Sequence, residues 1–407
     1  MSVVAFAEEA AGLTKIPAPC PAFGACGGCS LQDLAYPDQL LVKRRRLDRA
    51  LEVLGSVPAF GLTGLDDPWR YRNKAEFTFG SSGGRLTLGY HAARSYWRTV
   101  DLEDCLLLPE RAMKAVRGLR ALAEATGLPA YHPRTHQGFF RHAVIRHSAA
   151  NNRMMLSVFT ASRAPDGADP RARLEEIAER LMAEHPDVSG VSWGGTDRIA
   201  DTAEAETLVL LRGEAHLEDR LGPFTLRLLP GSFLQPNSRL AHRMYETLQA
   251  WVGERRPHTA WDLYCGVGPV SFYLSRGVKK VYAIEVEPRH LDLARVNARL
   301  NGITNVEFRE GRVEELLADR RFWLQDARPD VIVVDPPRAG LHERALSSLL
   351  AARPEALAYI SCNAQTLTRD LAVLTSSFPR YRLARLQAFD LFPHTNHLEV
   401  LTLLERR

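Results

Sequence analysis

The sequence predicts an α/β protein with two parts: an α+β domain over residues 1–229 and a doubly wound, mostly parallel sheet over residues 230–407. After Pro230, short apolar strands alternate with helices, which is typical of parallel sheets with crossover helices. Before it, strand-like runs such as Lys74–Gly80 and Arg85–His91 end in glycine or histidine and are mixed with helices. The length of 407 residues is sufficient for two or three domains.

The elements of the first domain begin with a basic helix candidate over residues 38–55, after a cysteine-rich loop. The two strand candidates follow it. A polar loop rich in Pro, Asp and Gly spans residues 161–170. Residues 173–186 have the apolar spacing of an amphipathic helix.

The elements of the second domain begin with a strand that enters a glycine turn. In chain order they are a strand and turn at 259–268, a strand at 279–287, a helix at 288–302, and strands at 305–311, 330–334, 356–362 and 397–406. Ligands of doubly wound sheets bind beyond the carboxyl ends of the strands. Tyr264, Glu285, Asp335 and Cys362 stand at four of these ends, so we expect them to face one crevice.

The composition excludes several classes of protein. Apolar residues make up 45% of the chain, and the formal net charge is only +4, so a basic surface has to come from local patches. No apolar run is long enough to cross a bilayer, and the first residues do not form a convincing signal peptide. Six cysteines in a chain of this length do not resemble a secreted disulfide scaffold. We therefore expect a cytoplasmic protein without a membrane partner.

The first strand of the second domain leads into a candidate nucleoside site. Gly266 and Gly268 permit a ligand to approach the backbone closely, and Glu285, 19 residues after Gly266, suits a carboxylate that binds ribose hydroxyls. The third glycine of the dinucleotide fingerprint is replaced by residues 269–271, which disfavours a pyrophosphate. S-adenosylmethionine fits this pattern, while a purely structural turn is the alternative. Cys265, inside the strand end, is expected in the core.

The segment "DPPR" forms a rigid turn directly after the strand at 331–334. Prolines fix φ and remove donors, so that carbonyl groups can face the crevice. Methyltransferases that act on the amino group of adenine carry a similar turn ending in an aromatic residue, which stacks on the base. Arg338 stands at that position here, which argues against chemistry on an exocyclic amine. A proline-rich loop without function is the alternative.

Cys362 and Glu399 suit methylation at carbon 5 of uracil. A thiolate that adds to carbon 6 turns carbon 5 into a nucleophile, and a base must later remove the hydrogen from carbon 5. Glu399 shares a strand face with Leu401 and Leu403, where an unpaired carboxylate is costly. The alternatives are a small buried cysteine and an exposed strand end.

Four segments together resemble the RNA uracil-C5 methyltransferase family: "DLYCGVG", "DPPRAG", "SCNAQT" and "FPHTNHLEVL". The resemblance implies a Rossmann-like class I methyltransferase domain that depends on S-adenosylmethionine. It implies Cys362 as the nucleophile and Glu399 as the base. It also implies that the cofactor is bound by Gln235, Tyr264, Glu285 and Asp335.

The N-terminal cysteines indicate a metal site. Cys20, Cys26 and Cys29 lie within ten residues, and Cys105 could provide a fourth thiolate. Four thiolates suit either an iron–sulfur cluster or structural zinc, and the spacing does not separate the two. Four unconnected reduced cysteines are the remaining alternative. The resemblance favours a [4Fe–4S] cluster in an N-terminal iron–sulfur and RNA-binding domain.

The cysteine set resembles that of the ribosomal RNA branch of the family. Because the cysteines begin by residue 20, we expect no N-terminal OB-type TRAM domain, and the short enzyme that modifies uracil 747 of 23S rRNA is the nearest match. We therefore expect a monomer that acts on 23S ribosomal RNA. The alternatives are a 1939-type uridine, a tRNA, an amino-methyltransferase, and an RNA-binding or redox protein that carries a cluster without methyl transfer.

Candidate RNA contacts are basic or aromatic residues of the first domain. The basic runs at 43–46 and 69–74 could neutralise phosphates. The aromatic candidates for stacking on unpaired bases are Phe77, Phe79, Tyr90, Tyr96 and Trp97. The alternatives are a solvated helix face for the first run and core positions for most of the aromatic residues.

Overall fold

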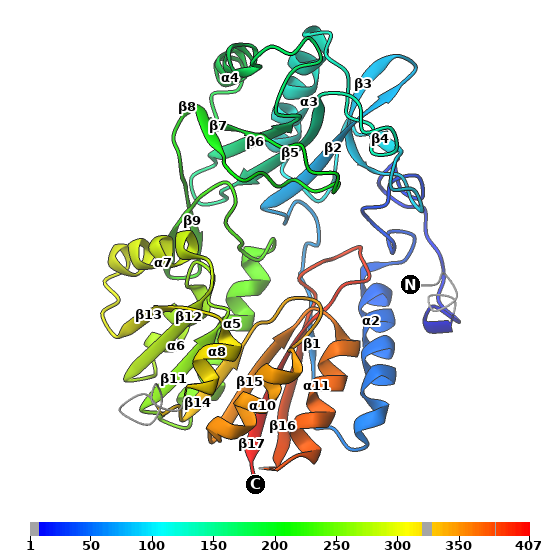
Figure 1. Cartoon of the computed structure of the whole chain (residues 1–407). Helices are drawn as coiled ribbons and strands as arrows, with labels where there is room; N and C mark the ends of the chain where they lie inside the picture. The colour runs from blue at the N-terminus through cyan, green and yellow to red at the C-terminus, as the bar shows by residue number, and fades with distance from the viewer. Residues whose placement is uncertain (1–7, 320–327, 379) are drawn as a thin grey trace.

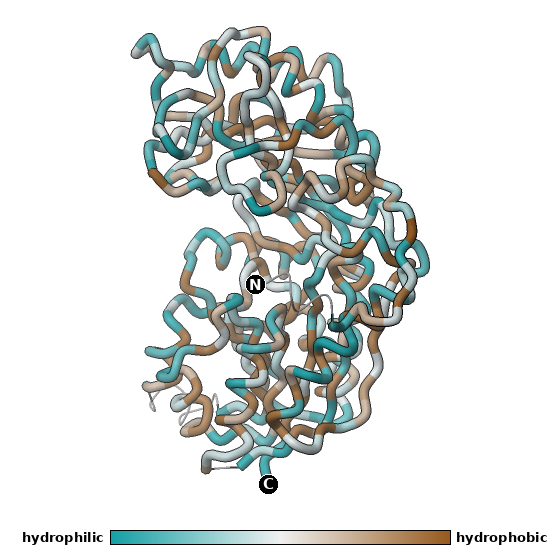
Figure 2. Tube along the Cα trace, turned by 90° about the vertical axis from the view of Figure 1, so that its right-hand side faces the viewer, coloured by the Kyte–Doolittle hydropathy of each residue, from teal (hydrophilic) through white to brown (hydrophobic). Residues whose placement is uncertain are grey.

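The computed structural model of the protein describes residues 8–319, 328–378 and 380–407. The chain forms two lobes, each built around its own β-sheet (Figure 1). Figure 2 shows the lobes one above the other and joined along one side, with apolar segments running through both.

The larger lobe contains an eight-stranded sheet with the order β1-β16-β17-β15-β14-β11-β12-β13. Its strands are β1 (Leu62–Thr63), β11 (Thr259–Leu263), β12 (Lys280–Glu285), β13 (Val306–Glu310), β14 (Val331–Val334), β15 (Ala356–Ser361), β16 (Tyr381–Phe389) and β17 (Glu399–Arg406). All pairs are parallel except those that β17 makes with β15 and β16. This arrangement confirms the predicted doubly wound sheet and its strands, to which the structure adds β16 and β1.

Helices cover both faces of this sheet (Figure 1). They are α5 (Ser238–Gly253), α6 (Pro269–Ser275), α7 (Pro288–Leu300), α8 (Val313–Ala318), α10 (Glu343–Ala352) and α11 (Ala364–Ser376). Strand β14 is buried throughout, and its alternate residues enter two separate cores, with Val333 in one and Ile332 in the other. A strand buried on both faces is apolar at every position, which explains the unbroken run at 331–334.

The smaller lobe contains a seven-stranded sheet with the order β4-β3-β2-β5-β6-β7-β8. Its elements are β2 (Lys74–Ser82), β3 (Arg85–His91), β4 (Thr99–Asp101), α3 (Glu110–Ala125), β5 (Phe140–His147), β6 (Met154–Thr160), α4 (Arg171–Glu184), β7 (Val188–Gly195) and β8 (Val209–Gly213). A two-stranded sheet, β9 (Leu217–Leu221) with β10 (Phe224–Leu228), follows it. The predicted α+β character and the helix near residues 173–186 are confirmed.

An N-terminal segment joins the larger lobe although it precedes residue 230. Helix α2 (Tyr36–Leu51) and the short η1 (Glu52–Leu54) lead into β1, which pairs in parallel with β16. Leu47 of α2 packs in the same core as Trp261 of β11. The division at residue 229 stays a prediction, and the structure shows that residues 36–63 lie with the second part of the chain.

Lys43 anchors α2 to the end of β16. Its side chain is 2% exposed, and the ammonium group is paired with Asp390 and donates to the carbonyl of Phe392 over 2.9 Å. Tyr36 donates to the other oxygen of Asp390 over 2.9 Å. Because a buried charge without its partner is costly, Lys43 has a structural role and does not bind phosphate as the basic run suggested.

Across the described ranges, no helix combines the length and apolar character that crossing a membrane requires.

Candidate active site

The predicted site residues meet at one edge of the eight-stranded sheet. Tyr264, Asp335 and Cys362 directly follow β11, β14 and β15, and Glu285 is the last residue of β12. These strands are parallel, so their carboxyl ends lie at the same edge. Glu399 is the first residue of the antiparallel β17 and therefore lies at this edge too. The structure confirms the placement that the strand ends predicted.

Strand register places Cys362 and Glu399 opposite each other. Ser361 of β15 pairs with Val400 of β17 in an antiparallel ladder. The next residue on each strand toward the edge is Cys362 on one side and Glu399 on the other. A thiol and a carboxyl group from segments 37 residues apart thus face the same space.

The carboxyl group of Glu399 is almost fully buried. The residue is 2% exposed, and its Oε2 atom has no hydrogen-bond partner among the described residues. Burial raises the pKa of Glu399 well above its usual value, the negative charge of Asp335 adds to this, and the Arg338 guanidinium opposes it. These surroundings favour the protonated form of Glu399 more than water does.

The Cys362 thiol has a similar balance of influences. Burial raises its pKa to about 11, the charge of Glu399 adds to the rise, and the guanidinium of Arg338 acts in the opposite direction. Arg338 is thus the group at this edge that favours the thiolate. The sequence drew attention to Arg338 only as a departure from the amino-methyltransferase pattern.

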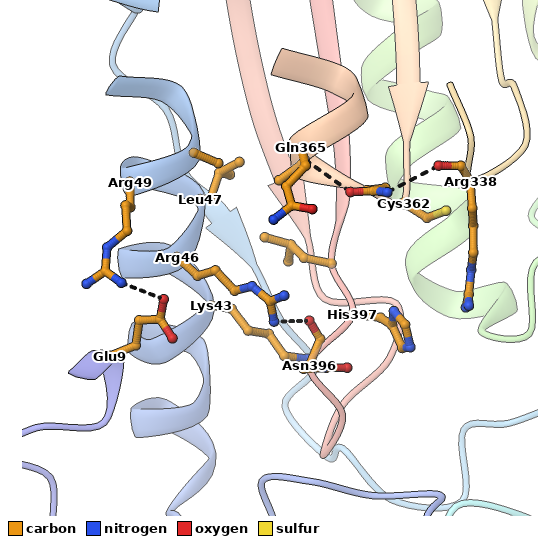
Figure 3. Close-up of a pocket in the computed structure, with 14 residues that line it drawn as sticks. Glu9, Lys43, Arg46, Leu47, Arg49, Arg338, Cys362, Gln365, Asn396 and His397 are labelled. Carbon is orange, nitrogen blue, oxygen red and sulfur yellow. Dashed lines mark hydrogen bonds and ion pairs between the residues drawn. The ribbon is translucent and has the colours of Figure 1, made fainter. Parts of the chain in front are cut away.

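Cys362 opens into a cleft of about 610 Å³. Figure 3 shows Cys362 and Arg338 on one side of this cleft, with Arg46 and Arg49 of α2 on the other side. Asn396 and His397 also line the cleft. Neither residue was predicted as part of the site, although both lie in the segment "FPHTNHLEVL". The cleft is large enough for a nucleoside, and its arginines suit flanking phosphates.

The start of α11 is tied to the turn that carries Arg338. The Asn363 side chain accepts from the backbone of Gln365 over 3.1 Å and donates to the carbonyl of Arg338 over 3.2 Å. Thr366 donates to the same carbonyl over 3.3 Å. Asn363 therefore caps the helix and fixes Arg338 next to Cys362.

His397 faces the cleft as a neutral ring. Burial lowers its pKa to about 4, and the positive charges of Arg338 and Lys43 lower it further. A neutral imidazole can both donate and accept a hydrogen bond, which suits the carbonyl and imide groups of a pyrimidine.

The glycine turn after β11 has the backbone conformation that the sequence suggested. Gly268 has φ 99°, and an added Cβ there would lie 2.6 Å from the ring of Phe272. Tyr264 has φ 68°, a strained value for a residue with a side chain. Such strain is often found at ligand sites. Gly266, with φ 55°, donates its backbone N–H to Glu285 Oε2 over 3.0 Å.

Backbone groups orient the carboxylate of Glu285. Its Oε1 atom accepts from the N–H groups of Val286 and Glu287 over 2.9 and 3.0 Å. Together with the bond from Gly266, these contacts hold the carboxylate at the turn. This placement is compatible with recognition of ribose hydroxyls.

Two aspartates of neighbouring strands have raised pKa values: Asp262 is buried within β11, and the half-buried Asp335 follows β14. Burial raises the pKa of Asp335 to about 7. Burial also raises the pKa of Asp262 to about 7, although Ser271 donates a 2.5 Å hydrogen bond to it. The sequence analysis missed Asp262, but an acid inside the buried strand "TAWDL" was a usable signal. Carboxyl groups with little access to water are suited to stabilise a cationic ligand.

Gln235 lies at the junction of the two lobes. It is buried, and its carbonyl accepts from the Asn73 side chain over 3.0 Å. The backbone N–H of Asn73 donates to the carbonyl of Pro236 over 2.9 Å. The segment at 69–74 therefore joins the lobes next to a predicted cofactor residue.

Several predicted RNA contacts are structural. Phe77 and Phe79 are fully buried in the core, so they cannot stack on bases. Arg70 is paired with Asp104, and Arg72 donates to the carbonyl of Lys74 over 2.7 Å. Packing in the core accounts for the two phenylalanines, and contacts within the chain account for the two arginines.

Other predicted RNA contacts differ in their surroundings. Arg46 lines the cleft beside Cys362. Tyr90 lines a small cavity with the N-terminal cysteines. Tyr96 and Trp97 are exposed. These last two alone of the five aromatic candidates present their rings to solvent.

The four N-terminal cysteines do converge. Cys20, Cys26, Cys29 and Cys105 border one cavity of about 40 Å³. Burial raises the pKa of Cys29 to about 12 and that of Cys105 to about 11. In residues 8–319, 328–378 and 380–407, no three His, Cys, Asp or Glu side chains form a group that could hold a metal ion. The structure thus shows that the four cysteines lie around one cavity.

The fold and the edge of the sheet define a class of protein. A doubly wound sheet with an antiparallel β17, a glycine turn after β11 and an acid at the end of β12 is typical of enzymes that bind a nucleoside cofactor. Buried carboxyl groups without a phosphate-binding glycine pattern suit a cationic methyl donor. The geometry thus defines a methyltransferase.

Comparison with known proteins agrees with this class. A family model described as tRNA (Uracil-5-)-methyltransferase matches residues 209–407. An uncharacterized RNA methyltransferase of Halalkalibacterium halodurans is 32% identical over 394 residues, which cover 96% of this chain and 84% of that protein. Another from Chlorobaculum tepidum is 31% identical over 411 residues, covering 96% and 83%.

A solved structure supports the same conclusion. The Pyrococcus abyssi tRNA (uracil-54, C5)-methyltransferase, in complex with S-adenosyl-L-homocysteine, has a TM-score of 0.74 and 26% identity. The match covers 95% of this chain and 86% of that one. The chain belongs to the RNA uracil-C5 methyltransferase family, and it is an enzyme that depends on S-adenosylmethionine.

Proposed function

We propose that the protein methylates carbon 5 of a uridine in 23S ribosomal RNA, with Cys362 as the nucleophile and Glu399 as the general base. The observation that carries this assignment is the register of β15 and β17, which sets the two side chains opposite each other at the edge of the sheet, where Cys362 lines the cleft. A base between them would meet the thiol and the carboxyl group together.

The first step is addition of the Cys362 thiolate to carbon 6 of the uracil. The thiol first releases its proton to water, and the guanidinium of Arg338 stabilises the thiolate that remains. The new S–C bond breaks the 5,6 double bond, and its electrons move to carbon 5 and the carbonyl oxygen at carbon 4. His397, as a neutral ring in the cleft, is a candidate donor to that oxygen.

The second step forms the C–C bond, and the third releases the product. S-adenosylmethionine supplies the methyl group from its sulfonium. Glu399, in its carboxylate form, then removes the hydrogen from carbon 5, and the electrons of that C–H bond restore the double bond and expel the thiolate. The raised pKa of Glu399 suits this role because a carboxylate with little solvation is a stronger base.

The cofactor is proposed to lie along the turn after β11. Glu285 would accept from ribose hydroxyls, Gly266 and Gly268 would permit close approach, and Tyr264 would contact the adenosine. Asp335 and Gln235 would bind the methionine end. The donor set fits a cation, since carboxyl groups raised in pKa by burial lose their proton more readily beside a positive charge.

The substrate is proposed to be a 747-type uridine of 23S ribosomal RNA, because four cysteines resemble the ribosomal RNA branch. A tRNA is the second candidate, since a solved relative of similar extent is named as a tRNA (uracil-54, C5)-methyltransferase. A 1939-type uridine would use the same chemistry. An amino-methyltransferase would not need Cys362 opposite Glu399.

We further propose that Cys20, Cys26, Cys29 and Cys105 hold a [4Fe–4S] cluster. The four cysteines border one cavity, which supports a ligand shared by all four thiolates. A [4Fe–4S] cluster takes four such thiolates, and structural zinc is the alternative. Anaerobic protein should be brown, with about four iron atoms per chain; colourless protein with about one zinc would support zinc instead.

Substrate choice can be tested with purified protein. The enzyme would be incubated with S-adenosylmethionine and either unmodified 23S rRNA or unmodified tRNA, and the nucleosides analysed by mass spectrometry. We expect 5-methyluridine in the rRNA. Product in the tRNA alone would establish the second candidate, and a methylated adenine or guanine would overturn the chemistry. Mass mapping of rRNA from a deletion strain would then locate the uridine.

A further inference from the structure

An exposed aromatic surface on the smaller lobe is not used by any step above. We define the Trp97 surface as Tyr96, Trp97, Arg98, His132 and Arg134. Tyr96 is 65% exposed and Trp97 is 42% exposed. We propose that the Trp97 surface binds an unpaired stretch of the substrate RNA, remote from the target uridine, by stacking on its bases. This proposal rests on the proposed function and names a second RNA contact for it.

Hydrogen bonds close the turn that carries the two aromatic residues. The N–H of Ala92 donates to the carbonyl of Arg98 over 2.7 Å, which closes the turn. Inside it, Ser95 accepts from the backbone of Arg98 over 3.2 Å. Arg94 has φ 63°, a conformation that is strained for a residue with a side chain. A closed turn presents exposed rings without the entropy loss of ordering a loop.

The charge of this surface suits a nucleic acid. The stretches at 92–98 and 130–138 contain three arginines and no acidic residue. The Arg134 guanidinium lies 5.8 Å from the centre of the Trp97 ring, and the ring of His132 lies 6.4 Å from it. Aromatic rings among arginines are typical of sites for single-stranded RNA, because stacking accepts any base and arginine neutralises phosphate.

Hydrogen bonds connect the Trp97 surface to the catalytic cleft. We define the cysteine segment as residues 20–31. Ala93 donates to the carbonyl of Ala25 in this segment over 2.8 Å. At the end of that segment, Ser30 and Leu31 donate to the carbonyl of His394 over 2.9 and 3.1 Å. His394 precedes Asn396, which lines the cleft. The N-terminal trace runs between β4 and the top of α2 in Figure 1. An RNA molecule that contacts both the Trp97 surface and the catalytic cleft would therefore meet two sites held in a fixed relative position.

Trp97→Ala combined with Tyr96→Ala tests the proposal. The matched control is Phe378→Ala, since Phe378 is an aromatic residue of the larger lobe that is 79% exposed. Methylation would be measured with a long 23S rRNA fragment, with unmodified tRNA, and with a short hairpin that holds only the target loop. Binding of a single-stranded oligouridylate would be measured separately by filter retention.

We expect the double variant to raise KM for the long RNA by about tenfold to a hundredfold, as the loss of one or two stacked bases predicts. Its kcat, its affinity for S-adenosylmethionine and its activity on the short hairpin should stay at the wild-type level. Trp97→Phe, which keeps a stacking ring, should restore most of the affinity, and Phe378→Ala should resemble the wild type.

The two proposals fail in different ways. Unchanged KM for the long RNA, together with unchanged binding of oligouridylate, would overturn the Trp97 surface while methylation continued. Absence of 5-methyluridine from every RNA with the wild-type enzyme would overturn the proposed function. Oligouridylate binding that depended on Trp97 would still support the surface in that case.

Discussion

Cys362 and Cys105 share a raised pKa and a nearby guanidinium that opposes it, but they border cavities of different size and lining. Burial is the largest cause for both, and both values are about 11. Cys362, however, opens into a cleft of about 610 Å³ beside a carboxyl group and a guanidinium, whereas Cys105 borders a cavity of about 40 Å³ with three other cysteines. Burial alone therefore does not determine the chemistry of a thiol. Its neighbouring groups and its access to a substrate determine it.

The largest effect is expected from Cys362→Ala. We expect methylation to fall by about 10⁴-fold or more, since alanine provides no thiolate to add to carbon 6. Cofactor affinity should remain nearly unchanged, because the thiol does not need to contact the cofactor. Methyl transfer measured with labelled S-adenosylmethionine, alongside calorimetric binding, provides the check. Substantial methyl transfer by the variant would show that Cys362 is not the nucleophile, and the proposed difference in chemistry between Cys362 and Cys105 would then be wrong.

The next effect is expected from Glu399→Gln. The amide cannot accept the hydrogen of carbon 5, so the enzyme should transfer the methyl group once and remain bound to RNA through Cys362. A slower band on a denaturing gel would reveal this adduct. Glu405→Gln on the same strand is the control, since Glu405 pairs with Arg255 away from the cleft. Rapid turnover without an adduct would remove Glu399 from the role of base.

A smaller effect on catalysis is expected from Cys26→Ser. This change should reduce the iron content, lower the free energy of unfolding and weaken RNA binding several-fold, because the cysteine segment contacts the loop that carries His394. Affinity for S-adenosylmethionine should change little. Thermal unfolding and RNA titration test this. Normal folding together with wild-type methylation would contradict a structural role for the four cysteines.

The smallest predicted effect concerns pH and stability. Burial holds the pKa of Asp335 at about 7, so the folded protein keeps a proton that the unfolded chain loses above about pH 4. The stability from this group is present below pH 4 and is lost as the pH rises through 7. In the absence of cofactor, the free energy of unfolding should therefore fall less between pH 5 and pH 8 for Asp335→Asn than for the wild type. Asp262, with a similar pKa, should keep part of that dependence. Identical pH profiles would contradict the raised pKa of Asp335.

The larger sheet could be predicted because its strands carry strong local signals. The run Val331–Val334 is apolar throughout, and the residues after it must leave the sheet at one edge. Parallel strands then place Asp335 and Cys362 at that edge without any knowledge of side-chain contacts. The roles of these residues came from a resemblance and from chemistry, and they stay predictions.

The contacts between distant segments could not be predicted in this way. The sequence "KRRR" does not reveal that Lys43 is paired with Asp390, because the partner lies 347 residues away. Strand β1 has two residues and too little pattern to be recognised. Likewise, periodicity alone cannot distinguish the buried Phe77 from the exposed Trp97. Such features depend on tertiary packing, which local sequence does not encode.

The central claim is that the Cys362 thiolate bonds to carbon 6 of a uridine. RNA that contains 5-fluorouridine tests it most directly, because the base cannot remove fluorine from carbon 5 and elimination stops. The enzyme would be incubated with this RNA and S-adenosylmethionine, digested, and analysed by mass spectrometry. We predict a methylated fluorouridine attached to the peptide that contains Cys362. Attachment to another cysteine, or methylated product without any covalent adduct, would contradict the account.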